Sequence, residues 1–146
     1  MRVRSILDAK GHEVVTIQPE ARTLDAALLM RRLDIGALVV VDAHGHMVGL
    51  MTEREVTRTL ATASHRVVDM RVSQVMNRAV VTANIDADVH TVMALMTDAR
   101  ARHVPIEDGG RLAGIVSLGD VVKARLQEVE MEVRVLRDLQ TSRISS

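Results

Sequence analysis

The chain has 146 residues, of which 19 are Lys or Arg and 19 are Asp or Glu, so its formal net charge is zero when His is neutral. This balance argues against a general nucleic-acid binder, and the absence of Phe, Trp and Tyr removes the aromatic platforms on which single-stranded bases stack. The absence of Cys excludes disulfides, thiol catalysis and thiolate metal sites.

The N-terminal half of the chain alternates strand and helix patterns. We expect a β-rich step, a helix whose apolar residues recur at i, i+3, i+4 and i+7, two strands joined by a tight turn, and a second helix. Thr23 is the expected N-cap of the first of these helices. The patterns fall at Val14–Ile17, at residues 23–33, at Ala37–Val41, at Gly49–Met51 and from Thr52 onward.

The C-terminal half repeats the same order of patterns. Residues 80–108 align with residues 14–42, and residues 114–121 align with residues 49–56. Such repetition indicates two copies of one small unit, and Asp88 is the expected N-cap in the second copy. The second set of patterns falls at Val80–Ala83, at residues 88–99, at His103–Glu107, at Gly114–Val116 and from Ser117 onward.

Each half therefore has the order β-α-β-β-α, and the segments that lead into the two halves, Val3–Leu7 and Val72–Met76, also match. One such unit has too small a core to be stable alone. We expect an α/β (α+β) fold in which two repeats pack about a pseudo-twofold axis. The expected divisions are repeat 1 at residues 2–62, a linker at 63–71, repeat 2 at 72–127, and a helical extension and tail at 128–146.

The last helix carries a heptad pattern. Its apolar residues are spaced 4, 3, 4 and 3, which is the spacing of a coiled-coil seam of about two heptads. The helix either lies on its own domain or pairs with a second subunit, and the sequence leaves both interpretations open. The five residues are Val122, Leu126, Val129, Val133 and Leu136.

In both halves a hydroxyl residue opens the second helix and a carboxylate follows three residues later. The pairs are Thr52 with Glu55 and Ser117 with Asp120. A carboxylate at a helix N-terminus can accept hydrogen bonds from a ribose diol, and helix N–H groups can meet phosphate oxygens. The same spacing is also that of a capping box, which is a purely structural device. Both interpretations remain open at this point.

The duplicated unit, with Gly-apolar-apolar-[Ser/Thr]-x-x-[Asp/Glu] after its second strand, resembles the CBS domain, and two in tandem resemble a CBS pair, or Bateman module. The resemblance covers about residues 2–127. Ile35–Asp42, Arg102–Ile106 and Gly114–Lys123 are similar to stand-alone bacterial CBS-pair proteins. This resemblance implies a regulatory module that binds an adenine nucleotide in clefts between the repeats. AMP is the favoured ligand, with ADP, ATP or NAD as alternatives, and the module itself is not an enzyme.

The resemblance also implies which residues line the two sites. Asp120 and Ser117 would meet the ribose, whereas Glu55 stands where the family usually has Asp, which puts the first site, with Thr52, in doubt. The expected walls around adenine are Thr16, Ile17, Ala37 and Leu38 in one site, and Thr82, Ala83, Val104 and Pro105 in the other. The expected phosphate contacts are Arg54, Arg58, Arg102, His103 and Lys123. Ordinary core packing and solvated surface charge are the alternatives.

Further expectations concern partners and location. We expect a homodimer, an unidentified regulated protein as partner, and neither nucleic acid nor a membrane as partner. The longest apolar run, which ends at Val41, is far too short to cross a bilayer, and we expect a cytoplasmic protein. No metal is expected, because His44 and His46 lack a third ligand. A ligand-free dimerisation or scaffold module is the alternative function.

Overall fold

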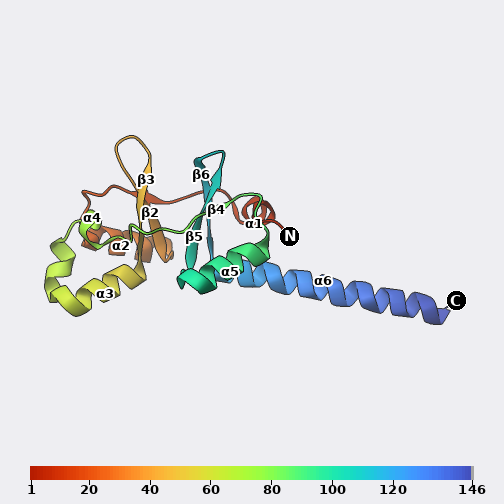
Figure 1. Cartoon of the computed structure of the whole chain (residues 1–146). Helices are drawn as coiled ribbons and strands as arrows, with labels where there is room; N and C mark the ends of the chain where they lie inside the picture. Colours follow the sequence, from red (N-terminus) through yellow and green to blue (C-terminus); the bar gives the residue numbers. More distant parts are fainter. Residues whose placement is uncertain (146) are drawn as a thin grey trace. The chain divides into compact units, whose positions relative to one another are not determined.

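The computed structural model describes the backbone of residues 1–145 and the side chains of residues 1–143. The chain forms two compact units, whose elements are labelled in Figure 1. The inner unit is the continuous segment of residues 13–82. The outer unit combines residues 1–12 with the chain from residue 83 onward.

Each unit contains a three-stranded sheet and helices in the expected order β-α-β-β-α. The inner elements are β1 (Thr16–Ile17), α2 (Thr23–Leu33), β2 (Ala37–Val41), β3 (Met47–Thr52), α3 (Glu53–Ala63), a 3-10 helix (Ser64–Asp69) and α4 (Val72–Val75). The outer elements are α1 (Val3–Lys10), β4 (Ala83–Asn84), α5 (Val89–Ala99), β5 (His103–Asp108), β6 (Arg111–Ser117) and α6 (Leu118–Ser145).

The two sheets have the same topology. The central strand, β2 or β5, pairs in parallel with the short first strand and antiparallel with the third. Its side chains are mostly buried, because the strand lies between two neighbours and is covered by helices. The expected strands at residues 37–41, 49–51, 103–107 and 114–116 are therefore confirmed, and each third strand is longer than expected.

The short helix that precedes each repeat packs in the unit formed by the other repeat. Helix α1, from the start of the chain, contacts β6 and α6 of the outer unit, while α4 contacts β3, α2 and α3 of the inner unit. Backbone hydrogen bonds fix both placements, such as Arg4 N–H to the Ile85 carbonyl at 2.8 Å and Val72 N–H to the Ala21 carbonyl at 2.8 Å. Each spatial unit therefore draws its first helix from the neighbouring repeat in the sequence.

Two equivalent glycines allow this packing. A Cβ built on Gly114 would lie 2.7 Å from Cδ2 of Leu7 in α1, and one built on Gly49 would lie 2.5 Å from Sδ of Met76. Leu7 is fully buried and Met76 is 8% exposed. The space above each third strand is thus taken by an apolar side chain from the exchanged segment.

Two local expectations need correction. Thr23 is not the N-cap of α2, because it lies inside the helix and its hydroxyl donates to the Met70 carbonyl at 3.0 Å; the N-cap position belongs to Arg22. Val80 and Val81 lie outside the sheet, and β4 begins at Ala83, where it meets Ile106. Helix α6 continues through Ser145, so the extension and tail expected at residues 128–146 is helical as far as the described residues extend. Asp88 does cap α5, since its carboxylate accepts from His90 N–H at 2.8 Å.

Candidate functional site

The start of α6 carries a reciprocal cap. Ser117 N–H donates to Oδ2 of Asp120 at 2.8 Å, and Asp120 N–H donates to Oγ of Ser117 at 3.1 Å. These two bonds satisfy backbone donors that a helix N-terminus otherwise leaves unpaired. The capping role that the sequence left open is therefore confirmed, while contact between Asp120 and a ribose stays a prediction.

Lys10, at the end of α1, forms an ion pair with the same carboxylate. Its Nζ donates to Oδ2 of Asp120 at 2.6 Å and to the Ile115 carbonyl at 3.0 Å. The side chains of Lys10 and Asp120 are 36% and 25% exposed. The site is thus a partly open carboxylate held by a helix N-terminus and an ammonium group.

These contacts set the protonation state of Asp120. Partial burial is the largest single influence and raises the pKa of the carboxyl, but the hydrogen bonds from Lys10 and Ser117 and the ammonium charge lower it by more in total. The pKa of Asp120 therefore lies below its ordinary value, and the group is an anion and a hydrogen-bond acceptor at neutral pH.

The equivalent position of the inner unit is occupied differently. Both the backbone N–H and the hydroxyl of Thr52 donate to Oε2 of Glu55, the N–H at 3.1 Å, in a capping box at the start of α3. When the leading segments are aligned, Ala79 stands where the outer unit has Lys10. The two sites consequently differ in both the acid and its cation.

Strand pairing brings predicted site residues together within each unit. Ala37 lies opposite Thr52 across β2 and β3, and His103 lies opposite Ser117 across β5 and β6. The first residue of each central strand is therefore next to the hydroxyl residue that ends the third strand. In each unit, the predicted site residue that begins the central strand and the hydroxyl residue that ends the third strand therefore lie at the same end of the sheet.

The same end of each sheet has strand neighbours on one side only. Strand β1 pairs with β2 from Val39 onward, and β4 pairs with β5 from Ile106 onward, whereas Leu38 and Pro105 pair only with the third strand. Pro105 has no N–H to donate to a strand ladder. The side chains of Leu38 and Pro105 are buried.

The structure divides the remaining predicted residues between the two units. Thr16, Ile17, Arg54, Arg58 and Thr82 belong to the inner unit. Ala83, Arg102, Val104 and Lys123 belong to the outer unit, where Val104 is fully buried in the core. Four of the predicted cations are solvent-exposed: Arg54, Arg58, Arg102 and Lys123.

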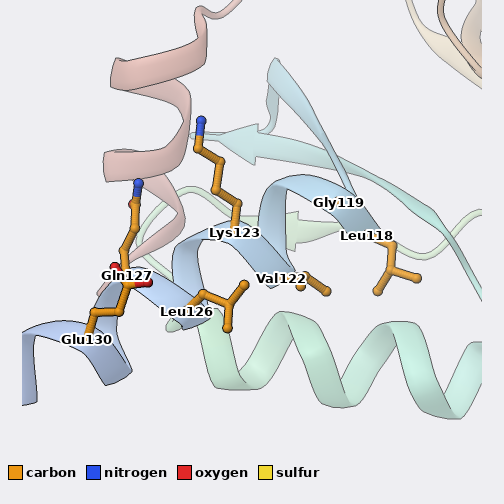
Figure 2. A pocket seen from close by; sticks show the side chains of 7 residues that line it. All are labelled: Leu118, Gly119, Val122, Lys123, Leu126, Gln127 and Glu130. Carbon is orange, nitrogen blue, oxygen red and sulfur yellow. The ribbon is translucent and has the colours of Figure 1, made fainter. Parts of the chain in front are cut away.

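A groove of about 550 Å³ lies along the first three turns of α6. Figure 2 labels its seven lining residues, all from this helix. Lys123 is the one predicted ligand contact among them, and the surface is otherwise mainly apolar. The lining residues are Leu118, Gly119, Val122, Lys123, Leu126, Gln127 and Glu130.

Within the described residues, no three His, Asp or Glu side chains are grouped as a metal ion would require. None of the helices described has the length and apolar character needed to cross a bilayer.

Sequence reasoning missed Lys10. Its partner Asp120 is 110 positions away, and the contact exists because α1 packs in the outer unit. The residue itself ends an ordinary short helix, where a basic side chain is common. Lys10 could have been predicted as a partner of Asp120 only if the exchange of the leading helices between the two repeats had been known.

Comparison with known proteins gives consistent relatives. The model of the family described as "CBS domain" matches residues 3–62 and 72–127. The chain is similar to a CBS-domain-containing protein from Agrobacterium tumefaciens, with 42% identity, a TM-score of 0.83, and coverage of 85% of this chain and 92% of that one. It is also similar to the CBS domain-containing protein YhcV of Bacillus subtilis, with 35% identity over 80% of this chain and 82% of that protein.

A third relative carries ligands in its crystal structure. It is the CBS domain pair of protein MJ0100 in complex with 5'-methylthioadenosine and S-adenosyl-L-methionine. The identity is 26% and the TM-score 0.77, and the match covers 88% of this chain and 98% of that one.

Proposed function

The chain belongs to the CBS domain family, and on that premise we propose that it is a cytoplasmic regulatory module that binds an adenine nucleotide, with Ser117 and Asp120 at the ribose. The observation that carries the proposal is the partly exposed, anionic Asp120 at the N-terminus of α6. The adenosyl ligands of the MJ0100 pair support the same ligand class.

The chemistry of Asp120 suits a sugar diol. A carboxylate accepts hydrogen bonds on two oxygens, and both bonds that the structure assigns to this one fall on Oδ2. A ribose can therefore use Oδ1 without breaking the helix cap. The N-terminus of a helix also favours an anionic ligand through its unpaired N–H groups.

Cations near this site suit the phosphate. Lys10 contacts Asp120 directly, Lys123 follows it by about one turn of α6, and His103 lies opposite Ser117. Charge-assisted hydrogen bonds to phosphate are about twice as strong as neutral ones. We therefore propose Lys10 as an additional ligand contact beside the residues predicted from sequence.

The backbone of each central strand suits the base. Aromatic residues are absent from the chain, so adenine recognition rests on aliphatic contact and on backbone N–H and C=O groups. Leu38 and Pro105 lie where the sheet has a neighbour on one side only. Of the two sites we propose the one at Asp120 as the stronger, because Glu55 is one methylene longer and Ala79 stands where the site at Asp120 has Lys10.

As a regulator, the module would switch between two conformations that bind the nucleotide with different affinities. Its effect on a partner protein can be no larger than that difference in affinity. We propose that it acts as a homodimer on a regulated protein and catalyses no reaction itself.

Calorimetry on the full chain tests the proposal. The ligands are AMP, ADP, ATP, NAD, 5'-methylthioadenosine and S-adenosyl-L-methionine. We expect at least one to bind, and Asp120→Asn to weaken it by about tenfold or more, because Asn keeps an acceptor for the cap but loses the charge. Asp98→Asn, an exposed carboxylate of α5, is the matched control and should leave affinity unchanged. Absence of heat and of any thermal shift with all six compounds would refute the nucleotide site.

A ligand-free scaffold is the second candidate. The observation that favours it is that Asp120 and Glu55 both serve as helix caps and that Lys10 already neutralises Asp120. This function predicts identical melting with and without every compound above, and an assembly state that no nucleotide changes.

A further inference from the structure

The seam defined by Val122, Leu126, Val129, Val133 and Leu136 is solvent-exposed along its whole length, at 40–65% for each side chain. The side of α6 that faces its own unit is different, since Val121 and Ala124 are 0% and 3% exposed there. All side chains from Val129 to Arg143 are exposed, and Figure 1 shows α6 continuing beyond α1 and α5. Packing on the outer unit therefore explains the first turns of α6 but not the seam.

The groove described above lies on this face. Three of its lining residues, Leu118, Val122 and Leu126, are apolar, exposed, and spaced four residues apart on successive turns (Figure 2). Two of them are the first seam residues. The outer unit thus leaves space beside the start of the seam for another helix.

We propose that α6 pairs with α6 of a second copy of this chain as a parallel, in-register, two-stranded coiled coil. Apolar residues spaced 4, 3, 4 and 3 form the contact stripe of such a pair. In the parallel register each of the five seam residues meets its own counterpart. This pairing supplies the interface of the dimer proposed above and is independent of the nucleotide site.

Charges beside the seam favour the parallel orientation. With Leu126 and Val133 at positions a, Glu132 is at g and Arg137 is at the following e. In a parallel pair, g of one helix faces the next e of the other, so Glu132 meets Arg137 of the second copy, and the reverse. Arg125 and Glu130 have the same relationship, although Arg125 also donates to Glu128 of its own chain at 3.1 Å.

Antiparallel pairing is disfavoured by the same residues. The register that places Leu126 opposite Leu136 brings Glu132 against Glu132 and Arg137 against Lys123. A shift of that antiparallel register by one heptad brings opposite charges together but removes an apolar layer. In one direction the shift places Leu136 opposite Gly119, and in the other it places Leu126 opposite Arg143. The parallel register combines five apolar layers with attractive charge pairs.

Single cysteines test both contact and orientation, because the natural chain has none. In the parallel pair, residue 136 of each copy faces residue 136 of the other, within reach of a disulfide. We expect Leu136→Cys to form a linked dimer under mild oxidation. Val135→Cys, whose side chain points away from the seam, should form at most about a tenth as much. Equal yields from the two variants, or no linked dimer from Leu136→Cys, would overturn the proposal.

Matched charge insertions provide a second readout by analytical ultracentrifugation of the full chain. Val133 and Val135 are 43% and 49% exposed, so aspartate is tolerated at either position in the folded subunit. In the Leu136→Cys background, Val133→Asp should abolish the disulfide and raise the dimer dissociation constant, whereas Val135→Asp should change neither. Equal effects of the two would contradict a seam at Val133.

Charge reversal tests the register itself. Glu132→Arg and Arg137→Glu should each weaken the dimer, and the double variant should restore it, because both cross-helix pairs then return with reversed polarity. Failure of the double variant to recover would exclude the parallel register. Calorimetry with the nucleotides on Val133→Asp separates the two proposals, since loss of the pairing leaves Asp120 and Lys10 in place.

Discussion

The contact between Lys10 and Asp120 joins residues that are 110 positions apart and holds α1 to the start of α6. Asp120 serves as helix cap and as ion-pair partner at once. Its cap could be read from the local spacing Ser-x-x-Asp, because that spacing depends on one turn of helix. Its cation could not, because Lys10 arrives through the tertiary exchange of α1.

The low pKa of Asp120 predicts a specific dependence of stability on pH. The folded pKa lies below the unfolded value of about 3.9, so the stabilisation is complete above that value and is lost as pH falls through the folded pKa. We expect Asp120→Asn to lower the free energy of unfolding by about 1–2 kcal/mol at pH 7. This difference from the natural chain should shrink progressively below about pH 4.

Urea titrations at pH 7, 5, 4 and 3 measure that difference. The other carboxyls with lowered pKa, Asp42 and Asp86, are present in both proteins and cancel in the comparison. In a Lys10→Met background the effect of Asp120→Asn should be smaller, because one of its partners is already absent. A difference that stays constant from pH 7 to pH 3 would show that the ionised carboxylate is not the stabilising species.

At the scale of secondary-structure elements, the exchanged helices depend on glycine. We expect Gly114→Ala to destabilise the chain by about 1–3 kcal/mol, because the new methyl would overlap the buried Leu7 side chain. Thermal unfolding followed by circular dichroism measures the loss. Leu7→Ala shortens the side chain that the new methyl would overlap. It should therefore lower the free energy of unfolding less in the Gly114→Ala background than in the natural chain.

Gly119→Ala is the control for this prediction. A Cβ there meets Oγ of Ser117 at 3.6 Å, which is ordinary contact, and Ala is favoured over Gly in a helix by roughly 0.5–1 kcal/mol. We expect this variant to be as stable as the natural chain or more so. Equal destabilisation by the two alanines would rule out crowding by Leu7 as the cause.

The same elements show how far the sequence predicts the fold. Strand Ala37–Val41 follows from a continuous apolar run, and the strand predicted at His103–Glu107 follows from its alignment with that run. The Asp88 cap follows from a side chain acting on a neighbouring backbone N–H. Thr23 was misread because its hydroxyl bonds to Met70, which is 47 positions away. Val80 and Val81 have strand propensity, but β4 pairs with β5 only from Ala83 onward. Strand propensity at these two residues is therefore overridden by tertiary context.

For the whole molecule, ligand binding and unfolding are linked. A nucleotide at one hundred times its dissociation constant should stabilise the folded chain by about 2.7 kcal/mol, which for a protein of this size raises the melting temperature by roughly 5–10 °C. Differential scanning calorimetry measures the rise, and Asp120→Asn should reduce it at the same nucleotide concentration. A rise that survives Asp120→Asn unchanged would place the ligand elsewhere.

The order of the elements along the chain also has a consequence for folding during synthesis on the ribosome. The inner unit is one uninterrupted segment, complete once residue 82 has emerged, whereas α1 emerges earlier but must wait for β6 and the first turns of α6. At a synthesis rate of roughly 5–20 residues per second, the first turns of α6 emerge about 6–23 s after α1. During this interval the apolar side of α1, with Val3 and Leu7, has no native surface to cover it, so a factor that shields nascent chains would meet this protein at α1.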